Sequence, residues 1–152
     1  MFRKALPGDC AAVYSLICNL ENRELPFPEF SCIFNSQLLN ESYCCLVCEQ
    51  DDNLSAVLNL RFEDQLHHAG RVAEIMEFAV APECRRKGLG QEMLEQACIA
   101  AKENGCMQIE VDCNLLREDA HRFYLREGMH CFHYKFSRSL TGSDSAENRL
   151  GR

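Results

Sequence analysis

A short basic loop carries the clearest chemical signal in this chain. Residues 84–91 read C-R-R-K-G-L-G-Q, in which three cations at 85–87 run into Gly88 and Gly90. The loop stands between an apolar run ending at Val80 and a helix-periodic segment from Leu89. A helix N-terminus offers unpaired N–H groups and attracts phosphate, and glycines let a bulky anion approach the backbone. The loop therefore predicts a phosphate or diphosphate site.

Two familiar nucleotide motifs do not describe this loop. The P-loop pattern G-x-x-x-x-G-K-[ST] is absent, and Met93 stands where G-x-G-x-x-G needs its third glycine. A solvated turn with a capping glycine is the alternative interpretation of G-x-G alone. Because the net charge is −7, an anion must be attracted by local cations.

Hydrophobic periodicity and turn signals predict an α/β domain in the order β-α-α-β-β-β-α-β-α-β. The predicted strands cover 2–6, 43–49, 54–62, 72–80, 107–113 and 131–140, and the predicted helices 11–20, 29–39, 89–104 and 119–127. The sheet is expected to be mixed, with its first half antiparallel. The strand–helix–strand unit over 72–113 should bring two strands into parallel contact.

The composition is that of one globular domain. The chain has 152 residues, and we expect a domain over 1–140 followed by a disordered tail over 141–152 that lacks an apolar pattern. No long apolar run predicts a transmembrane helix, and no basic cluster beyond 85–87 predicts nucleic-acid binding. Pro7 and Asp9 interrupt the N-terminus, so a signal peptide is not expected.

Eleven cysteines are present, an odd number. Without a secretory signal, free thiols in a reducing cytoplasm are the expectation. Cys45 and Cys48 form a C-x-x-C within a predicted strand, where alternation points them to opposite faces. No zinc or other metal site is predicted, and most of the cysteines are expected to be small core residues.

Three stretches resemble the GNAT superfamily of acyl-CoA N-acyltransferases. R-R-K-G-L-G at 85–90 is similar to its R/Q-x-x-G-x-G/A signature, E-I-M-E-F-A-V-A-P at 74–82 to its central strand, and the stretch 112–128 with its Phe-Tyr to its closing motif. The resemblance spans roughly residues 2–140. It implies the GNAT fold, with a mixed, mostly antiparallel sheet of six to seven strands and about four helices, and acetyl-CoA as cosubstrate.

A narrower resemblance concerns the acceptor. A-V-Y-S-L-I-C at 12–18, L-H-H at 66–68 and A-H-R-F-Y-L-R-E-G at 120–128 look like the bacterial aminoalkylphosphonate N-acetyltransferases. Those enzymes acetylate small amines that also carry a phosphonate. Met129 departs from the aromatic residue usual after that glycine, which is expected to alter packing rather than chemistry.

The resemblance assigns catalytic roles to three residues. Tyr124 matches the tyrosine that protonates the leaving thiolate, a step a phenol can perform. Glu74 aligns with the strand glutamate used as base, and Glu77 is the second candidate. The odd separation puts the two carboxylates on opposite faces unless a bulge intervenes. The alternatives are a core aromatic for Tyr124 and structural hydrogen bonds for the glutamates.

Binding residues follow from the same motifs. The acetyl-CoA set comprises Phe78, Ala79, Val80, Arg85, Arg86, Lys87, Gly88, Leu89, Gly90, Gln91, Asn114 and Phe123. Backbone N–H groups at 78–80 should stabilise the developing oxyanion. Substrate-phosphonate contacts are assigned to His67, His68, Arg117 and His121, for which solvent-facing positions are the alternative.

The sequence thus predicts a cytoplasmic N-acetyltransferase that moves the acetyl group of acetyl-CoA directly to a small primary amine, without an acyl-enzyme. Of the cysteines, which could carry an acyl group, only Cys84 lies at a motif position. Polyamines, aminoglycosides and protein lysines are the alternative acceptors, and a CoA-binding regulatory module without turnover is the alternative class. A divalent metal requirement, the acyl-chain preference and a homodimer are left open.

Overall fold

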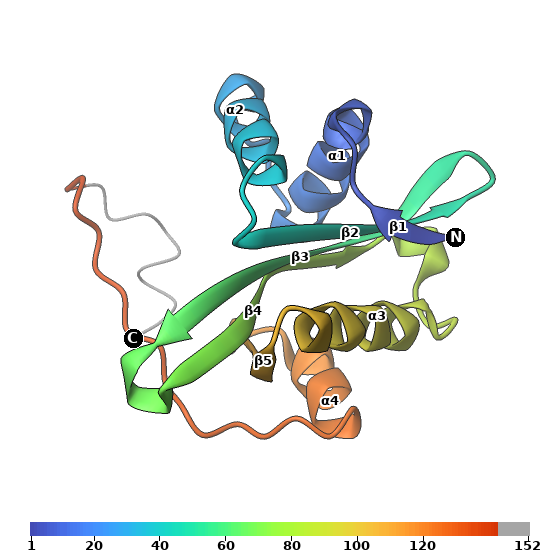
Figure 1. Ribbon diagram of the computed structural model, residues 1–152. Helices are drawn as coiled ribbons and strands as arrows, with labels where there is room; N and C mark the ends of the chain where they lie inside the picture. Colours follow the sequence, from blue (N-terminus) through green and yellow to red (C-terminus); the bar gives the residue numbers. More distant parts are fainter. Residues whose placement is uncertain (143–152) are drawn as a thin grey trace. The chain divides into compact units, whose positions relative to one another are not determined.

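A computed structural model describes residues 1–142 of the chain. The strands are β1 Phe2–Lys4, β2 Tyr43–Gln50, β3 Asn53–Gln65, β4 Gly70–Val80 and β5 Cys106–Val111, and the helices are α1 Cys10–Glu21, α2 Phe27–Leu38, α3 Leu89–Glu103 and α4 Glu118–Arg126 (Figure 1). The chain divides into two compact units, Met1–Val111 and Asp112–Arg152. Except for residues 141 and 142, the predicted tail lies outside the described residues. One domain over 1–140 stays a prediction.

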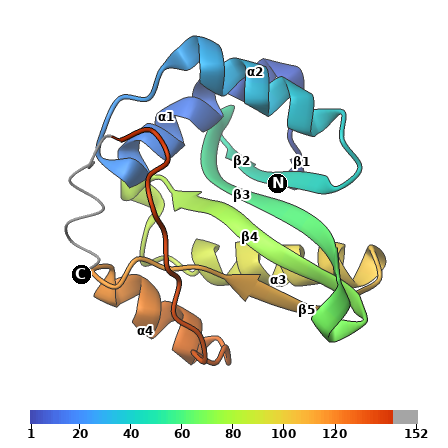
Figure 2. The ribbon, with the colours of Figure 1, turned by 90° about the vertical axis from the view of Figure 1, so that its left-hand side faces the viewer.

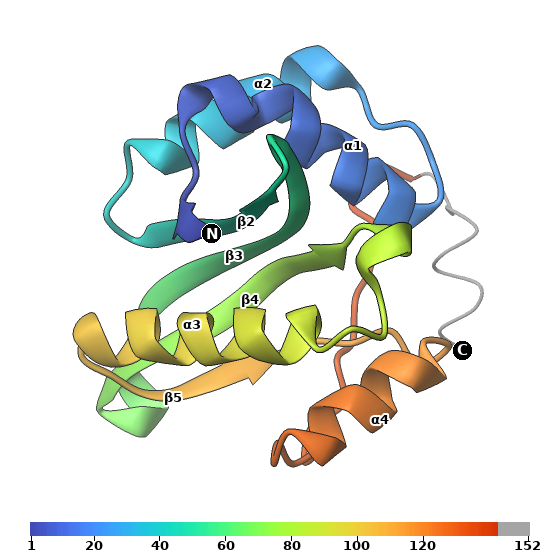
Figure 3. The same ribbon diagram turned by 90° about the vertical axis from the view of Figure 1, so that its right-hand side faces the viewer.

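The first unit is a five-stranded sheet in the order β1-β2-β3-β4-β5. The first four strands pair antiparallel, and β4 pairs with β5 in parallel, as the sequence predicted. α1 and α2 cover one face of the sheet (Figure 2), and α3 lies along the other face beside β4 and β5 (Figure 3). Helix α3 is the crossover that parallel pairing of β4 and β5 requires.

Local sequence explains the boundaries of these elements. Asp51 and Asp52 both adopt positive φ angles, of 49° and 59°, so the β2–β3 hairpin closes through a left-handed two-residue turn. Proline opens α2, and Asn104 with Gly105 ends α3, where Gly105 has a φ of 76°. The predicted elements in this unit are confirmed within a few residues.

Both faces of the sheet bury apolar side chains. Val13 and Ile17 of α1 and Phe34 of α2 pack with Val47, Val57 and Ala79 of the sheet in one core cluster. Leu58 and Leu60 of β3 are fully buried and, by alternation, point to the opposite face. Helix α3 covers that face with its own buried stripe, which comprises Leu89, Met93, Leu94, Ala97 and Ala101.

A β-bulge in β4 changes which side chains share a face. Asn59 pairs with Glu77, but the next residue of β3, Leu60, pairs with Ile75, so Met76 is one residue more than β3 can match. Arg61 pairs with Glu74. Because Asn59 and Arg61 are two residues apart on β3, their partners Glu77 and Glu74 lie on the same face. Simple alternation, which separates the two carboxylates, is therefore wrong here.

The predicted strand over 131–140 is also wrong. The structure assigns no strand there, and the side chains of Phe132, Tyr134 and Phe136 are 80–91% exposed. Their alternation is typical of a strand, but a strand exists only where its backbone finds a partner edge. Within the described residues the sheet thus has five strands, fewer than the six to seven expected.

Candidate active site

The basic loop forms the N-terminus of α3, as predicted. Gly88 is the residue that caps the helix, with a φ of 84°, and Arg86 before it has a φ of 60°. The first N–H groups of a helix have no acceptor within the helix, so the backbone of residues 89–91 is available to an anion. A Cβ placed on Gly88 would meet no atom within 4 Å, so the space beside it is open.

The three cations of the loop differ in their contacts. Arg85 donates from Nε to the carbonyl of Val80 at 3.0 Å and from Nη2 to Asn19 Oδ1 at 3.3 Å. Its guanidinium thus ties the loop to the end of β4 and to α1. Arg86 and Lys87 have exposed side chains. The loop cations that remain suited to a mobile anionic ligand are therefore Arg86 and Lys87.

The end of β4 extends beyond its pairing with β5. The β4–β5 register stops at the pair Ile75–Val111, five residues before the strand ends at Val80. Phe78, Ala79 and Val80, assigned to the donor site from the sequence, all lie in this last stretch. The residues of β4 that lead into the loop therefore lie beyond its pairing with β5.

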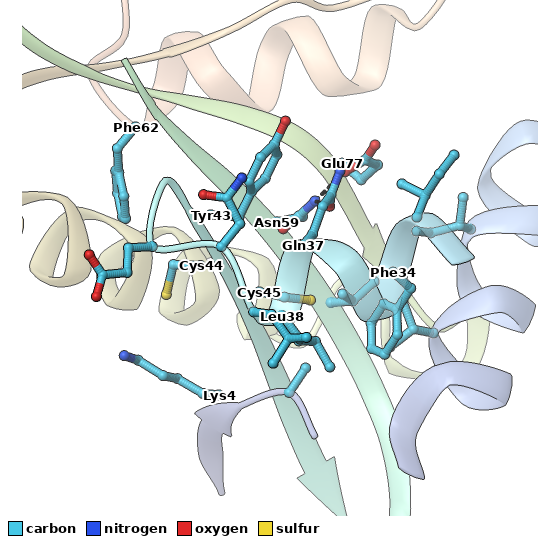
Figure 4. Close-up of a pocket in the computed structure, with 18 of the residues that line it drawn as sticks. Lys4, Phe34, Gln37, Leu38, Tyr43, Cys44, Cys45, Asn59, Phe62 and Glu77 are labelled. Atoms are coloured by element: carbon cyan, nitrogen blue, oxygen red, sulfur yellow. Dashed lines mark hydrogen bonds between the residues drawn. The ribbon is translucent and has the colours of Figure 1, made fainter. Parts of the chain in front are cut away.

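A cavity of about 640 Å³ is lined by residues of α1 and α2 and of the sheet face that they cover, and also by residues outside that face, among them Cys44 and Phe62 (Figure 4). Gln37, Cys45, Asn59 and Glu77 are among the residues that line it. Asn59 Nδ2 donates to Glu77 Oε2 and to Gln37 Oε1, both at 2.9 Å. Figure 4 shows these three polar side chains converging from α2, β3 and β4. The cavity therefore combines apolar walls with one hydrogen-bonded carboxylate.

Glu77 has the electrostatics of a base. Burial raises the pKa of its carboxyl above the ordinary value, the Asn59 hydrogen bond acts in the opposite direction, and the charge of Glu21 raises it further. Glu74 is placed differently, since Arg61 Nη2 donates to its Oε2 at 2.6 Å in an ion pair. Of the two candidates from the sequence, Glu77 is among the residues that line the cavity and Glu74 is not.

Cys45 lines the same cavity as Glu77, but its thiol is poorly suited to act as a nucleophile. Burial, with the nearby Glu77 charge, raises the pKa of its thiol to about 12. A thiol with that pKa is protonated at neutral pH and reacts poorly. Cys84 lies in the turn before the loop, 3.9 Å from Gln50 Oε1. No described cysteine is disulfide-bonded.

The predicted residues of the second unit lie on or before α4. Burial raises the pKa of Tyr124 to about 12, with the neighbouring Cys113 adding to the shift and Arg117 opposing it. Phe123 packs edge-to-face on Tyr124, with ring centroids 5.3 Å apart. Asn114 caps a turn by accepting the Leu116 N–H on its Oδ1 at 2.9 Å. Tyr124 therefore stays a phenol, able to donate a proton, at neutral and moderately alkaline pH.

His121 and Arg117 also belong to the α4 region. His121 Nε2 donates to the Asn114 carbonyl at 2.8 Å, so the structure brings these two predicted site residues together. Arg117 precedes the first residue of α4 as its N-cap. Neighbouring Arg122 pairs with Asp119. Their roles toward a substrate stay predictions.

His67 and His68 lie far from the loop. They sit in the 3₁₀ turn Leu66–His68 that precedes β4, with ring centroids 4.3 Å apart, and His68 Nδ1 bonds Gln65 Oε1 at 2.6 Å. β4 separates them from the loop by roughly 30 Å of strand. Within residues 1–142, no group of three His, Cys, Asp or Glu side chains could hold a metal ion.

Asn59 and Gln37 are site residues that the sequence reasoning missed. Asn59 is only 7% exposed and stands in the run S-A-V-L-N-L, whose other residues are buried. A polar residue inside an apolar strand is the signal that could have identified it, because burying an amide is costly without a partner. Gln37 gives no such signal, since a glutamine on a half-exposed helix is ordinary.

Comparison with known proteins agrees with this architecture. The model of the acetyltransferase (GNAT) family matches residues 11–129. The chain is 34% identical, over 91% of its length and 90% of the relative, to an aminoalkylphosphonate N-acetyltransferase of Salmonella typhimurium (strain LT2). The fold and these matches define an N-acetyltransferase of the acetyl-CoA-dependent class. The chain belongs to the GNAT family of acetyltransferases.

Solved structures share the fold at low sequence identity. A transcriptional regulator from Bacillus halodurans C-125 superposes with a TM-score of 0.85 at 20% identity, covering 92% of this chain and 99% of the other. Glucosamine-6-phosphate N-acetyltransferase from Arabidopsis thaliana gives a TM-score of 0.77 at 21% identity, covering 92% and 97%. In the part of the chain that the structure describes, no helix is long and apolar enough to cross a membrane.

The loop geometry yields a prediction about Gly88. Replacing it by alanine forces a side-chain-bearing residue into the left-handed region and should lower the free energy of unfolding by about 1 kcal/mol. Gly8→Ala is the matched control, because its Cβ meets nothing within 4 Å and its φ is not left-handed. Urea unfolding of the three proteins measures the difference. Equal stability of Gly88→Ala and Gly8→Ala would contradict the strained conformation.

Proposed function

We propose that this protein transfers the acetyl group of acetyl-CoA directly to a small primary amine, and that the amine is an aminoalkylphosphonate. The observation that carries the proposal is the position of Glu77, a hydrogen-bonded carboxylate with a raised pKa that lines a cavity of about 640 Å³. Such a group can take a proton from an ammonium ion near neutral pH. The named activity of the Salmonella relative supports the narrower acceptor class.

The donor site fits the acidic parts of acetyl-CoA. The N–H groups at the start of α3 and the side chains of Arg86 and Lys87 would hold its pyrophosphate. The stretch of β4 beyond its pairing with β5 would contact the pantetheine arm, and the backbone of 78–80 would donate to the thioester oxygen. Asn114 and Phe123 stay predicted contacts of the same ligand.

The proposed reaction has three balanced steps. Glu77 takes a proton from the ammonium group, and the neutral amine attacks the thioester carbonyl. The carbonyl oxygen becomes an oxyanion that backbone N–H groups stabilise. The C–S bond then breaks, and Tyr124 donates its proton to the departing thiolate. The amide forms as the nitrogen loses its second proton, which returns to the Tyr124 phenolate directly or through solvent. No step requires a cysteine, which is consistent with the protonated thiol of Cys45.

The acceptor assignment predicts the outcome of an amine panel. Purified protein with acetyl-CoA should release thiol with aminomethylphosphonate and 2-aminoethylphosphonate faster than with polyamines, aminoglycosides or a lysine peptide. Thiol release is measured with a chromogenic disulfide, and the N-acetyl product by mass spectrometry. Preference for another amine would refute the acceptor class. Tight acetyl-CoA binding without turnover of any amine would instead support a regulatory module.

The assignment of Glu77 as the base predicts different results for the variants Glu77→Gln and Glu74→Gln. Glu77→Gln keeps an acceptor for Asn59 but cannot take a proton, so kcat/KM at pH 7 should fall about 10²-fold and lose its acid limb. Glu74→Gln should keep both the acid limb and most of the activity, because Glu74 is engaged with Arg61. pH profiles of kcat/KM measure both. The reverse pattern would identify Glu74 as the base.

The acid assignment predicts the effect of Tyr124→Phe. This change keeps the ring against Phe123 and removes the proton, so kcat should fall by about 10²-fold or more. Because burial holds the pKa of Tyr124 at about 12, wild-type kcat should show no loss of this acid up to pH 10. Tyr134→Phe is the control, since that side chain is 82% exposed. An unchanged kcat across all pH values would refute the role.

A further inference from the structure

Asn59 is a polar residue buried among the apolar side chains of the first unit. Its neighbours Leu58 and Leu60 are fully buried, and Asn59 itself is 7% exposed. Its Oδ1 is buried and has no hydrogen-bond partner among the residues that the structure describes. A leucine would fill this place in β3 without burying an amide. A buried amide with an unmatched acceptor lowers stability, which indicates a function other than packing.

The amide connects three elements through one nitrogen. Asn59 Nδ2 donates to Glu77 Oε2 of β4 and to Gln37 Oε1 of α2, each at 2.9 Å. While Glu77 is ionised, its carboxylate can only accept, so the amide presents its nitrogen to it, and Gln37 Oε1 accepts from the same nitrogen. Gln37 thereby holds the orientation of Asn59, and Asn59 holds the orientation of the Glu77 carboxylate.

The same hydrogen bond bears on the charge of Glu77. Burial favours the protonated carboxyl, whereas an N–H donor favours the carboxylate, so Asn59 opposes the upward shift of the Glu77 pKa. The other titratable or charged groups toward this side chain and its cavity come from several elements: Glu21 of α1, Glu41 before β2, Tyr43, Cys44 and Cys45 of β2, Lys4 of β1, Arg61 of β3, and Arg71 and Glu74 of β4. Among the causes of the Glu77 shift, the Asn59 bond alone lowers the pKa.

We propose that Asn59 is a positioning residue of the acceptor site, which aims the Glu77 carboxylate into the cavity and keeps it ionised, with Gln37 fixing the amide. The proposal rests on the proposed function, because it makes Asn59 act through the base. Its consequence is that the geometry of α2 is coupled to the protonation state of Glu77 through a single pair of hydrogen bonds.

The test is the pKa of Glu77 measured directly, in wild type and in Asn59→Leu. Protein labelled with ¹³C at glutamate carboxyls is titrated by NMR, and the Glu77 signal is the one that Glu77→Gln removes. Loss of the donor disfavours the carboxylate, so the pKa should rise by about one unit in Asn59→Leu. The acid limb of kcat/KM should move to higher pH by the same amount, and the rate should recover toward wild type above it.

Recovery of the rate at high pH distinguishes a positioning role of Asn59 from a loss of folded structure. A variant that is only misfolded loses activity at every pH, whereas a shifted base loses it only on the acid side. Asn59→Ser, which is smaller and too short to bridge both partners, gives a second variant if leucine prevents folding. Gln37→Leu should shift the pKa in the same direction by less. Asn35→Leu, on the exposed side of α2, is the control and should shift nothing.

The NMR and kinetic readouts can fail independently. If the Glu77 pKa is the same in wild type, Asn59→Leu and Asn59→Ser, the proposal is overturned, whatever the substrate proves to be. If the pKa rises but the acid limb of kcat/KM does not follow, Asn59 does set the pKa and the base assignment under the proposed function fails. The titration needs no acceptor, so it remains decisive even if no aminoalkylphosphonate is acetylated.

Discussion

The extra residue in β4 is the constraint on which the polar wall of the cavity around Glu77 depends. A strand paired without a bulge sends residues three apart to opposite faces, and here Glu74 and Glu77 share one face because Met76 has no counterpart on β3. The bulge sets up two cross-strand rows on the α1–α2 face: Cys45–Asn59–Glu77 and Tyr43–Arg61–Glu74. The Asn59–Glu77 hydrogen bond and the Arg61–Glu74 ion pair both follow from this register.

The burial of successive cross-strand rows decreases along the sheet. The preceding row, Val47–Val57–Ala79, is buried in the core cluster under α1 and α2. The next row holds Asn59 and Glu77 at the boundary of that core, and the row beyond it carries the Arg61–Glu74 ion pair with more solvent contact. Glu77 therefore sits where burial is deep enough to raise its pKa and a donor is still within reach. A carboxylate in the row of Val57 would lie in the apolar core, and one in the row of Arg61 would be paired with a guanidinium.

The same strand also serves the donor side. β4 loses its β5 partner after Ile75, at the bulge, and continues to the loop that begins α3. The departure of β5 and the bulge thus occur within two residues of each other. At this irregular point the β4–β5 pairing ends and the Glu77 carboxylate comes to line the cavity.

The sequence by itself determined the elements of the first unit, the parallel β4–β5 pair and the loop at the start of α3. These depend on local periodicity, turn residues and glycines, which a linear pattern records. It also indicated the family, through motifs of fixed spacing. It failed at residues 131–140, where alternation predicted a strand that the structure does not form.

Only the tertiary structure showed that Glu77 and not Glu74 is among the residues lining the cavity, and only it revealed the contact of Asn59 with Gln37. The bulge is a register shift between two strands, and the sequence of neither strand alone indicates it. A hydrogen bond between residues 22 or 18 positions apart likewise depends on how α2, β3 and β4 meet. Sequence patterns describe each element separately, whereas the protonation of a buried carboxylate is set by its neighbours in space.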